Sequence, residues 1–239
     1  MIRTNNLTKR FKDKTAVNSL NLTINKGELF SLLGVNGAGK TTTVKMLSTL
    51  ITPTSGEIFI KGINTAENKA EIRKIINISP QETAIAPNLT VMENIEFMSG
   101  VYALPKSSDR IEKLINDFKL EEILKQKAKT LSGGWQRRLS IALSLINDPE
   151  ILFLDEPTLG LDVLARRELW SVINGLKGKI TVILTTHYME EAEKLSDRVG
   201  IMSKGHLTHI GTPQELIEAA QAKSFEDAFV TLANGGEAL

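Results

Sequence analysis

The stretch GVNGAGKTT, residues 34–42, fits the pattern G-x-x-x-x-G-K-[ST] without a gap. An apolar run, LFSLL (29–33), precedes it, and Val44, Leu47 and Ile51 follow it at helical spacing. A strand, a glycine-rich turn and a helix in this order present backbone N–H groups and the positive end of a helix to an anion. The sequence therefore predicts a phosphate-binding loop at the carboxyl end of a buried strand.

The residue types of this loop indicate how it binds phosphate. Lys40 is expected to reach the β- and γ-phosphates of a nucleotide, and the hydroxyl of Thr41 to bind Mg²⁺. The alternative is an ordinary glycine-rich turn, and the strand and helix on either side weigh against it. The residues predicted to surround the phosphates are Gly34, Asn36, Gly37, Ala38, Gly39, Lys40, Thr41 and Thr42.

Three more apolar runs end in polar residues: IINIS (75–79) before Pro80 and Gln81, ILFL (151–154) before Asp155 and Glu156, and ITVILTT (180–186) before His187. Continuous apolar runs of this length are typical of strands buried on both faces of a parallel sheet. Ligands of such sheets bind outside the carboxyl ends of the strands. We therefore expect these polar groups to meet beside the phosphate-binding loop.

The acidic pair is predicted to have two different roles, because adjacent side chains of a strand point to opposite faces. Asp155 is suited to hold Mg²⁺, usually through water, and Glu156 to act as a general base for the attacking water. A solvated acidic pair before a turn is the alternative. His187 is suited to hydrogen-bond a γ-phosphate or the attacking water, and a satisfied structural histidine is its alternative.

Residues from about 88 to 146 differ from this strand-rich frame, because their apolar residues recur at helical spacing. Within them, Ser132, Gly133 and Gly134 precede an amphipathic helix and form a second helix start suited to phosphate, or simply a capped loop. The segment EIFI (57–60) alternates as in a half-exposed antiparallel strand. Helices are also predicted from Pro213 and over 225–233.

Composition excludes several classes of protein. The chain has 239 residues, no cysteine and a net charge of +1, so disulfide frameworks, zinc ribbons and thiol catalysis are excluded. The balanced charge gives no indication of nucleic-acid binding, and we expect none. We find no apolar run near the roughly 20 residues of a spanning helix and no secretory signal, so a cytoplasmic location is expected.

Taken together, these motifs resemble the ATP-binding cassette family, the nucleotide-binding subunits of ABC transporters. The similar motifs occur in the family's order over about residues 1–215: GVNGAGKTT with Walker A, Gln81 with the Q-loop glutamine, LSGGWQRR (131–138) with the signature motif, ILFLDEP (151–157) with Walker B, LGLD (159–162) with the D-loop, and His187 with the switch histidine.

The resemblance implies an α/β fold, in which a P-loop NTPase core with a mostly parallel sheet carries an N-terminal antiparallel β subdomain and an inserted α-helical subdomain at about residues 88–146. We expect the ABC ATPase domain to cover residues 1–215 and a C-terminal helical tail to cover 216–239. The helical subdomain is expected to dock on a separate integral membrane permease at the cytoplasmic face of the membrane.

The resemblance also implies an ATPase that uses Mg²⁺ and dimerises with a second copy of itself around two ATP. Phe11 matches the aromatic residue that stacks on adenine, and Ser132, Gly133 and Gly134 of one copy would face Walker A of the other. The catalytic residues would be Glu156, His187 and Gln81, and the Mg²⁺ ligands would be Thr41, Gln81 and Asp155. The segments 78–98 and 224–232 resemble the branch of drug, sodium and polysaccharide exporters.

Two other functions are compatible with a phosphate-binding loop. One is an ABC-type ATPase that acts as a switch on another assembly, but the chain lacks both long coiled-coil insertions and a second cassette. The other is an unrelated P-loop kinase or GTPase. The nearest match to a guanine-reading N-K-x-D motif, residues 68–71, lacks the aspartate.

Overall fold

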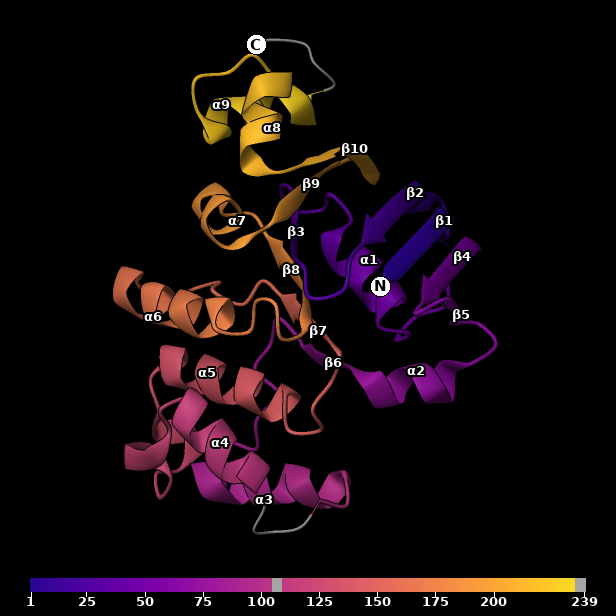
Figure 1. Ribbon diagram of the computed structural model, residues 1–239. Coiled ribbons are helices and arrows are strands. Elements are labelled where there is room, and N and C mark those ends of the chain that lie inside the picture. Colours follow the sequence, from indigo (N-terminus) through magenta and orange to yellow (C-terminus); the bar gives the residue numbers. More distant parts are fainter. Residues whose placement is uncertain (105–108, 235–239) are drawn as a thin grey trace.

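The computed structural model describes residues 1–104 and 109–234 (Figure 1). It contains two sheets, and helices cover the larger sheet and form a separate group at one end of the molecule (Figure 1). This arrangement confirms the predicted α/β class. Residues 105–108 of the expected helical subdomain and residues 235–239 of the expected tail lie outside the described residues.

The smaller sheet is antiparallel and has the strand order β2-β1-β4-β5. Its strands are β1 (Ile2–Phe11), β2 (Lys14–Ile24), β4 (Ser55–Ile60) and β5 (Ile63–Asn64). Buried and accessible residues alternate in part of β2, with Leu20, Leu22 and Ile24 facing the core. One face of this sheet therefore packs on the protein, as its sequence pattern predicts.

The larger sheet is mostly parallel and has the order β10-β9-β3-β8-β7-β6, in which only β10 is recorded as antiparallel to its neighbour. Its strands are β3 (Leu29–Leu33), β6 (Ile76–Ser79), β7 (Ile151–Asp155), β8 (Thr181–Thr186), β9 (Arg198–Ser203) and β10 (His206–Gly211). All residues of β3, β7 and β8 are buried. Their unbroken apolar sequences reflect this burial on both faces.

The helices, as far as the structure describes the chain, are α1 (Lys40–Leu47), α2 (Lys69–Ile75), α3 (Val91–Val101), α4 (Asp109–Asp117), α5 (Gly133–Ser144), α6 (Val163–Asn174), α7 (Met189–Leu195), α8 (Pro213–Ala219) and α9 (Phe225–Ala233), with 3₁₀ turns η1 (Glu121–Ile123) and η2 (Ala128–Thr130). Helices α3, α4 and α5 follow β6 and precede β7, and they lie together, away from the smaller sheet (Figure 1). The α-helical insertion expected from the sequence is therefore present.

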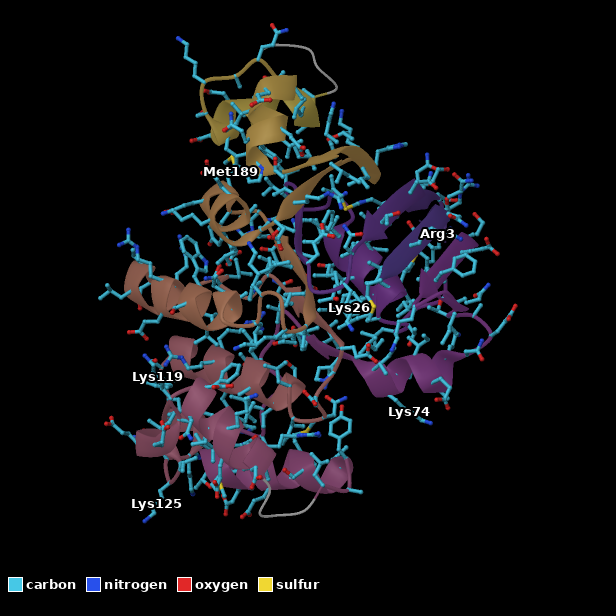
Figure 2. The ribbon with its side chains drawn as sticks, in the orientation of Figure 1. Arg3, Lys26, Lys74, Lys119, Lys125 and Met189 are labelled. Atoms are coloured by element: carbon cyan, nitrogen blue, oxygen red, sulfur yellow. The ribbon has the colours of Figure 1, made fainter. Side chains whose placement is uncertain are left out.

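The C-terminal helices are packed on the larger sheet. Phe225, Phe229 and Leu232 of α9 share a core with Leu33 of β3 and Val199 of β9. Charged side chains instead cover the outer surface, among them Lys74 on α2 and Lys125 beside the helical insertion (Figure 2). Within residues 1–104 and 109–234, we find no helix with the length and apolarity that crossing a membrane requires.

Candidate active site

The phosphate-binding loop connects β3 to α1 and is held between the two sheets. The N–H of Gly34 donates to the carbonyl of Thr186 (3.3 Å) at the end of β8. Gly39 has φ +106°, and a Cβ atom there would lie 2.6 Å from the carbonyl oxygen of Ala16 in β2. A Cβ on Gly34 would collide with the carbonyl of Met202 in β9. Glycine is therefore required at both positions by backbone conformation or by close approach.

Lys40 begins α1 and turns back over the loop. Its Nζ donates to the carbonyl oxygens of Gly34 (2.7 Å) and Val35 (3.3 Å), and its side chain is 5% exposed. The tip of the loop, Asn36 and Gly37, is exposed, whereas Ala38 is buried. The lysine charge is thus held at the base of a loop whose tip faces solvent.

The two residues predicted as Mg²⁺ ligands on the loop and on β7 are in direct contact. The hydroxyl of Thr41 donates to Oδ1 of Asp155 (3.0 Å), and the hydroxyl of Thr185 in β8 donates to the same oxygen (2.6 Å). Asp155 is buried. The structure therefore places an ordered carboxylate beside a hydroxyl, a set of oxygen donors of the kind that Mg²⁺ prefers.

Glu156 lies between Lys40 and His187. Its Oε1 is 3.1 Å from Nζ of Lys40, and its Oε2 is 2.6 Å from Nδ1 of His187. The residue has φ +49°, which is unusual for a side chain of this size. Its N–H donates to the carbonyl (3.1 Å) and to the hydroxyl (3.0 Å) of Thr185, and these bonds hold the strained backbone in place.

Gln81 and Phe11, which the sequence analysis assigned individually as a catalytic and an adenine-binding residue, are both exposed. The side chain of Gln81 follows β6 and is open to solvent. Phe11 ends β1 with 49% of its surface exposed, and Nζ of Lys9 lies 5.1 Å from the centre of its ring. One face of an aromatic ring is therefore available near the N-terminal sheet, in keeping with a stacking role that stays a prediction.

The second predicted anion site begins α5. Ser132 is the N-cap of this helix, and its hydroxyl oxygen accepts from the N–H of Trp135 (3.5 Å). A Cβ on Gly134 would lie 2.9 Å from Cβ of Ala165 on α6, so α5 and α6 approach closely here. A Cβ on Gly133 would meet Leu161, in the loop before α6, at 4.0 Å, and Ser132 and Gly133 are exposed.

Comparison with known proteins identifies the family. A family model described as ABC transporter matches residues 17–159, more than half of the chain. This chain belongs to the ABC transporter family. It is an ABC ATPase domain.

Similar proteins occur in bacteria and in animals, where phospholipid-transporting ATPase ABCA3 of Homo sapiens is 40% identical over 84% of this chain and 12% of its own length. The Escherichia coli (strain K12) protein named probable multidrug ABC transporter ATP-binding protein YbhF is 40% identical over 97% of this chain and 41% of its own length. The Bacillus subtilis (strain 168) linearmycin resistance ATP-binding protein LnrL is 39% identical over 90% of this chain and 70% of its own length. The chain thus spans less than half the length of YbhF.

Solved structures agree with the fold. The ATP-binding subunit of an ABC transporter superposes with a TM-score of 0.84 at 27% identity, over 97% of this chain and 99% of that one. The ATP-binding cassette MJ0796, a dimer in a post-hydrolysis state bound to ADP and Pi, gives 0.79 at 29% identity, over 89% and 98%. These matches confirm the predicted P-loop core with its antiparallel and helical additions.

Arg137 of the signature helix is a site residue that the sequence analysis missed. Its guanidinium donates to the carbonyls of Pro80, Gln81 (3.2 Å), Asp155 (2.8 Å) and Pro157 (2.8 Å). Burial lowers the pKa of Arg137 to about 10, and the nearby carboxylates oppose this shift, so the side chain stays charged at neutral pH. It ties the segment after β6 to the end of β7 and the turn that follows it.

Glu191 on α7 is a second missed residue. It is fully buried, and its Oε1 accepts from the hydroxyl of Thr158 (2.8 Å) and from Nε1 of Trp170 (2.9 Å). Burial raises the pKa of Glu191, and these hydrogen bonds limit the rise. The sequence marks Glu191 only by its position four residues after His187. A single glutamate on a short charged helix otherwise has the pattern of an ordinary solvent-exposed residue.

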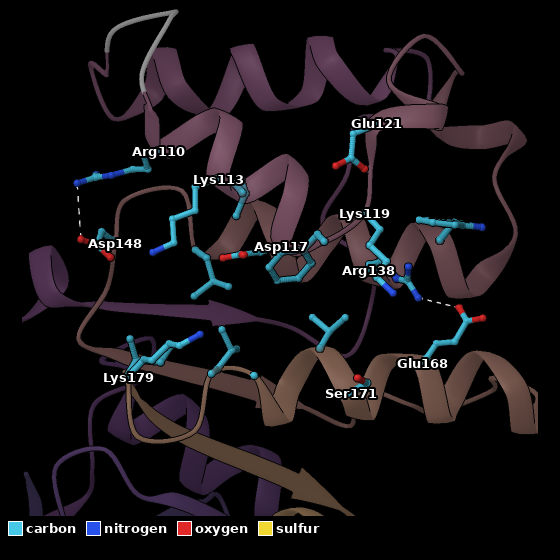
Figure 3. Close-up of a pocket in the computed structure, with 18 of the residues that line it drawn as sticks. Arg110, Lys113, Asp117, Lys119, Glu121, Arg138, Asp148, Glu168, Ser171 and Lys179 are labelled. Carbon is cyan, nitrogen blue, oxygen red and sulfur yellow. Dashed lines mark hydrogen bonds and ion pairs between the residues drawn. The ribbon is translucent and has the colours of Figure 1, made fainter.

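A separate groove of about 880 Å³ lies between α4, α5 and α6 (Figure 3). Its rim carries charges of both signs, including the ion pairs Arg110–Asp148 (3.6 Å) and Arg138–Glu168 (2.7 Å), drawn as dashed lines. Its lining residues are distinct from the phosphate-binding loop, the acidic pair and His187. The chemistry of the cassette is therefore expected at the strand ends and not in this groove.

Proposed function

We propose that this cassette hydrolyses ATP with Glu156 as general base and that hydrolysis drives a substrate outward through a separate membrane permease. The observation that carries the proposal is the meeting of Lys40, Glu156 and His187 at hydrogen-bond distance beside the phosphate-binding loop. Three strands far apart in sequence deliver these groups to one edge of the sheet. A nucleophile could be activated there next to a bound phosphate.

Glu156 is the side chain suited to take the proton of the attacking water. As that water's oxygen bonds to the γ-phosphorus, the bond to the β-phosphate oxygen breaks, and Glu156 holds the released proton. His187 orients the carboxylate through its Nδ1 and keeps its other ring nitrogen for the γ-phosphate. Lys40 and the N–H groups of the loop stabilise charge that develops on the phosphate oxygens.

Mg²⁺ fits the donors that the structure brings together. Thr41 and Asp155 offer oxygen ligands 3.0 Å apart, and Gln81 is the third proposed ligand. No group of three or more His, Cys, Asp or Glu that could hold a metal occurs in the described part of the chain, in keeping with an ion bound largely by phosphates and water. When bound, Mg²⁺ would neutralise charge on the β- and γ-phosphates.

The permease is proposed to dock on the helical insertion at the cytoplasmic face of the membrane. Helix α3 exposes Phe97 (59%) and Val101 (61%), with Tyr102 (37%) directly after it. These neighbouring apolar side chains offer a surface that a partner could cover. Outward transport is suggested by the names of YbhF and LnrL, which refer to multidrug transport and to linearmycin resistance.

We also propose the site and domain assignments that follow from this function. Phe11 stacks on adenine, and Gly34 together with residues 36–42 surrounds the phosphates of one copy. Ser132, Gly133 and Gly134 of a second copy close the site from the opposite side. The ATPase domain would cover residues 1–215, followed by the C-terminal tail.

The experiment compares Glu156→Gln with the wild-type chain by ATPase assay and by size-exclusion chromatography. Glutamine keeps the size of the side chain but cannot accept the proton, so ATP should bind while hydrolysis falls about 10²–10³-fold. The variant should elute as a dimer with Mg-ATP and as a monomer with Mg-ADP. Adding Ser132→Arg, which blocks the second half of the site, should abolish the dimer. Wild-type hydrolysis by Glu156→Gln would refute the assignment of the base.

A further inference from the structure

The ring of His187 lies against the ring of Tyr188, the next residue in the chain. Their ring centres are 4.1 Å apart, and the planes are inclined by 39°. The guanidinium carbon of Arg166, on α6, lies over the same tyrosine at 4.5 Å from the ring centre. A cation, a tyrosine and the histidine that bonds Glu156 are therefore in successive contact, and we call this group the Arg166–Tyr188–His187 stack.

Arg166 is also connected to the D-loop of this chain. One of its terminal nitrogens donates to the carbonyl of Leu161 (3.4 Å), and Asp162 caps α6 by accepting from the N–H groups of Leu164 and Ala165 (2.9 Å each). Nε of Arg166 is buried and has no hydrogen-bond partner among the described residues. The close contacts of this guanidinium thus include the carbonyl of Leu161 and the ring of Tyr188.

A second contact joins the same two segments. Glu191 on α7 accepts from Thr158, the residue before the D-loop, and from Trp170 on α6. The N–H of Tyr188 donates to the hydroxyl of Thr186 (2.9 Å), which fixes the backbone just after His187. The segment that carries the histidine therefore contacts α6 at Tyr188 and again at Glu191.

We propose that Arg166 and Tyr188 are positioning residues that set the orientation of the His187 ring and link it to the position of the D-loop. The bond from Nδ1 to Glu156 fixes one edge of the imidazole but leaves rotation about that bond. Stacking on Tyr188 restricts this rotation, and Arg166 holds Tyr188 in place. The inference rests on the proposed function, in which His187 orients Glu156 and contacts the γ-phosphate.

The first test measures ATP hydrolysis by Arg166→Met, Tyr188→Leu and Tyr188→Phe. Methionine keeps the apolar stem of arginine without its charge, and leucine removes the aromatic face. In both we expect kcat to fall about tenfold, because small misplacements of catalytic groups cost much of the rate, while KM for ATP stays within about twofold. Tyr188→Phe keeps the ring and should recover most of the rate lost in Tyr188→Leu.

Arg3→Ala is the matched control. Arg3 lies over the ring of Phe59 at 5.1 Å, on the N-terminal sheet and far from α6 (Figure 2). Its removal deletes the same kind of interaction elsewhere and should leave kcat unchanged. Wild-type kcat in Arg166→Met and Tyr188→Leu, or equal losses in Tyr188→Phe and Tyr188→Leu, would overturn the proposal.

A second readout does not depend on hydrolysis. The chain has three histidines, so the ring signals of His187 can be assigned by NMR with a His187→Gln reference. Loss of the tyrosine ring current should move these signals in Tyr188→Leu, and loosening of the stack should move them in Arg166→Met but not in Arg3→Ala. Unmoved signals would refute the stack. A wild-type chain without ATPase activity would instead refute the proposed function.

Discussion

Nζ of Lys40 and Oε1 of Glu156 are 3.1 Å apart, and both side chains are more than nine-tenths buried. The residue proposed to bind phosphate and the residue proposed to activate water therefore form an ion pair with each other. The phosphates of ATP carry the same sign of charge as Glu156, so they would compete with it for Lys40. Binding of the nucleotide is thus expected to release the base from its cation.

The ion pair between Lys40 and Glu156 predicts that Lys40→Met lowers the free energy of unfolding. Removing one partner of a buried ion pair leaves the other charge uncompensated, which typically costs about 3–5 kcal/mol. Urea unfolding should show a loss of this order for Lys40→Met and a smaller loss for Lys40→Met/Glu156→Gln, because the double variant has no unpaired carboxylate. Both should hydrolyse ATP at least about 10²-fold more slowly. Equal stability of the two variants would argue against the ion pair.

Phe11→Ala is expected to weaken nucleotide binding. Stacking of a base on an aromatic ring contributes about 1–3 kcal/mol, and an aromatic face does not distinguish adenine from guanine. Titration calorimetry should therefore show a similar loss for ATP and GTP. Val230→Ala, at an apolar residue of α9 with 37% exposure, is the control. If Phe11→Ala instead lowers stability without changing affinity, the ring has a packing role.

Arg137→Met should lower the free energy of unfolding and disturb the ends of β6 and β7. It would leave the buried carbonyls of Asp155 and Pro157 without their donors, at a cost of about 1–3 kcal/mol for each unsatisfied group. The neighbouring Arg138→Met is the control, because Arg138 is buried like Arg137 but its ion-pair partner Glu168 is 64% exposed, so its loss leaves no buried acceptor among the described residues without a donor. Equal losses of Tm in the two variants would contradict the bridging role of Arg137.

Glu191→Gln should change how stability depends on pH. The folded-state pKa of Glu191 is raised by burial, so the folded protein holds this proton more tightly, and stability is lost as pH rises above the ordinary value of 4.5. Glutamine does not titrate. The free energy of unfolding of Glu191→Gln relative to wild type should therefore increase between pH 4.5 and pH 7.5 in urea titrations. A difference that is constant with pH would refute this assignment.

The sequence predicted the elements whose burial follows a regular pattern, either continuous along a strand or repeated at helical spacing. The apolar run 29–33 is β3, and the interval 225–233 is α9. The polar residues after the strands were expected to meet beside the loop. Lys40, Glu156 and His187 do so, whereas Gln81 is exposed and its side chain does not join them. The local pattern of residues sufficed there because neighbouring parallel strands end at the same edge of their sheet.

The groups that bridge separate elements could not be predicted in this way. Residues 137–144 of α5 are all buried, so no apolar stripe distinguishes the inner position of Arg137 from the others. Its four acceptors are carbonyl oxygens, which every residue has and no sequence pattern marks. The stack of Arg166 on Tyr188 likewise depends on how α6 and the segment before α7 pack.

Gly34 packs closely against Met202 and Gly39 against Ala16, so the phosphate-binding loop is in tight contact with both sheets. Ala16 belongs to the N-terminal sheet and Met202 to the larger one. The loop therefore lies between the two sheets, and neither glycine has room for a Cβ atom. A relative rotation of the sheets must deform the loop or be blocked by it. Nucleotide held in the loop would therefore lock the two sheets into a single rigid unit.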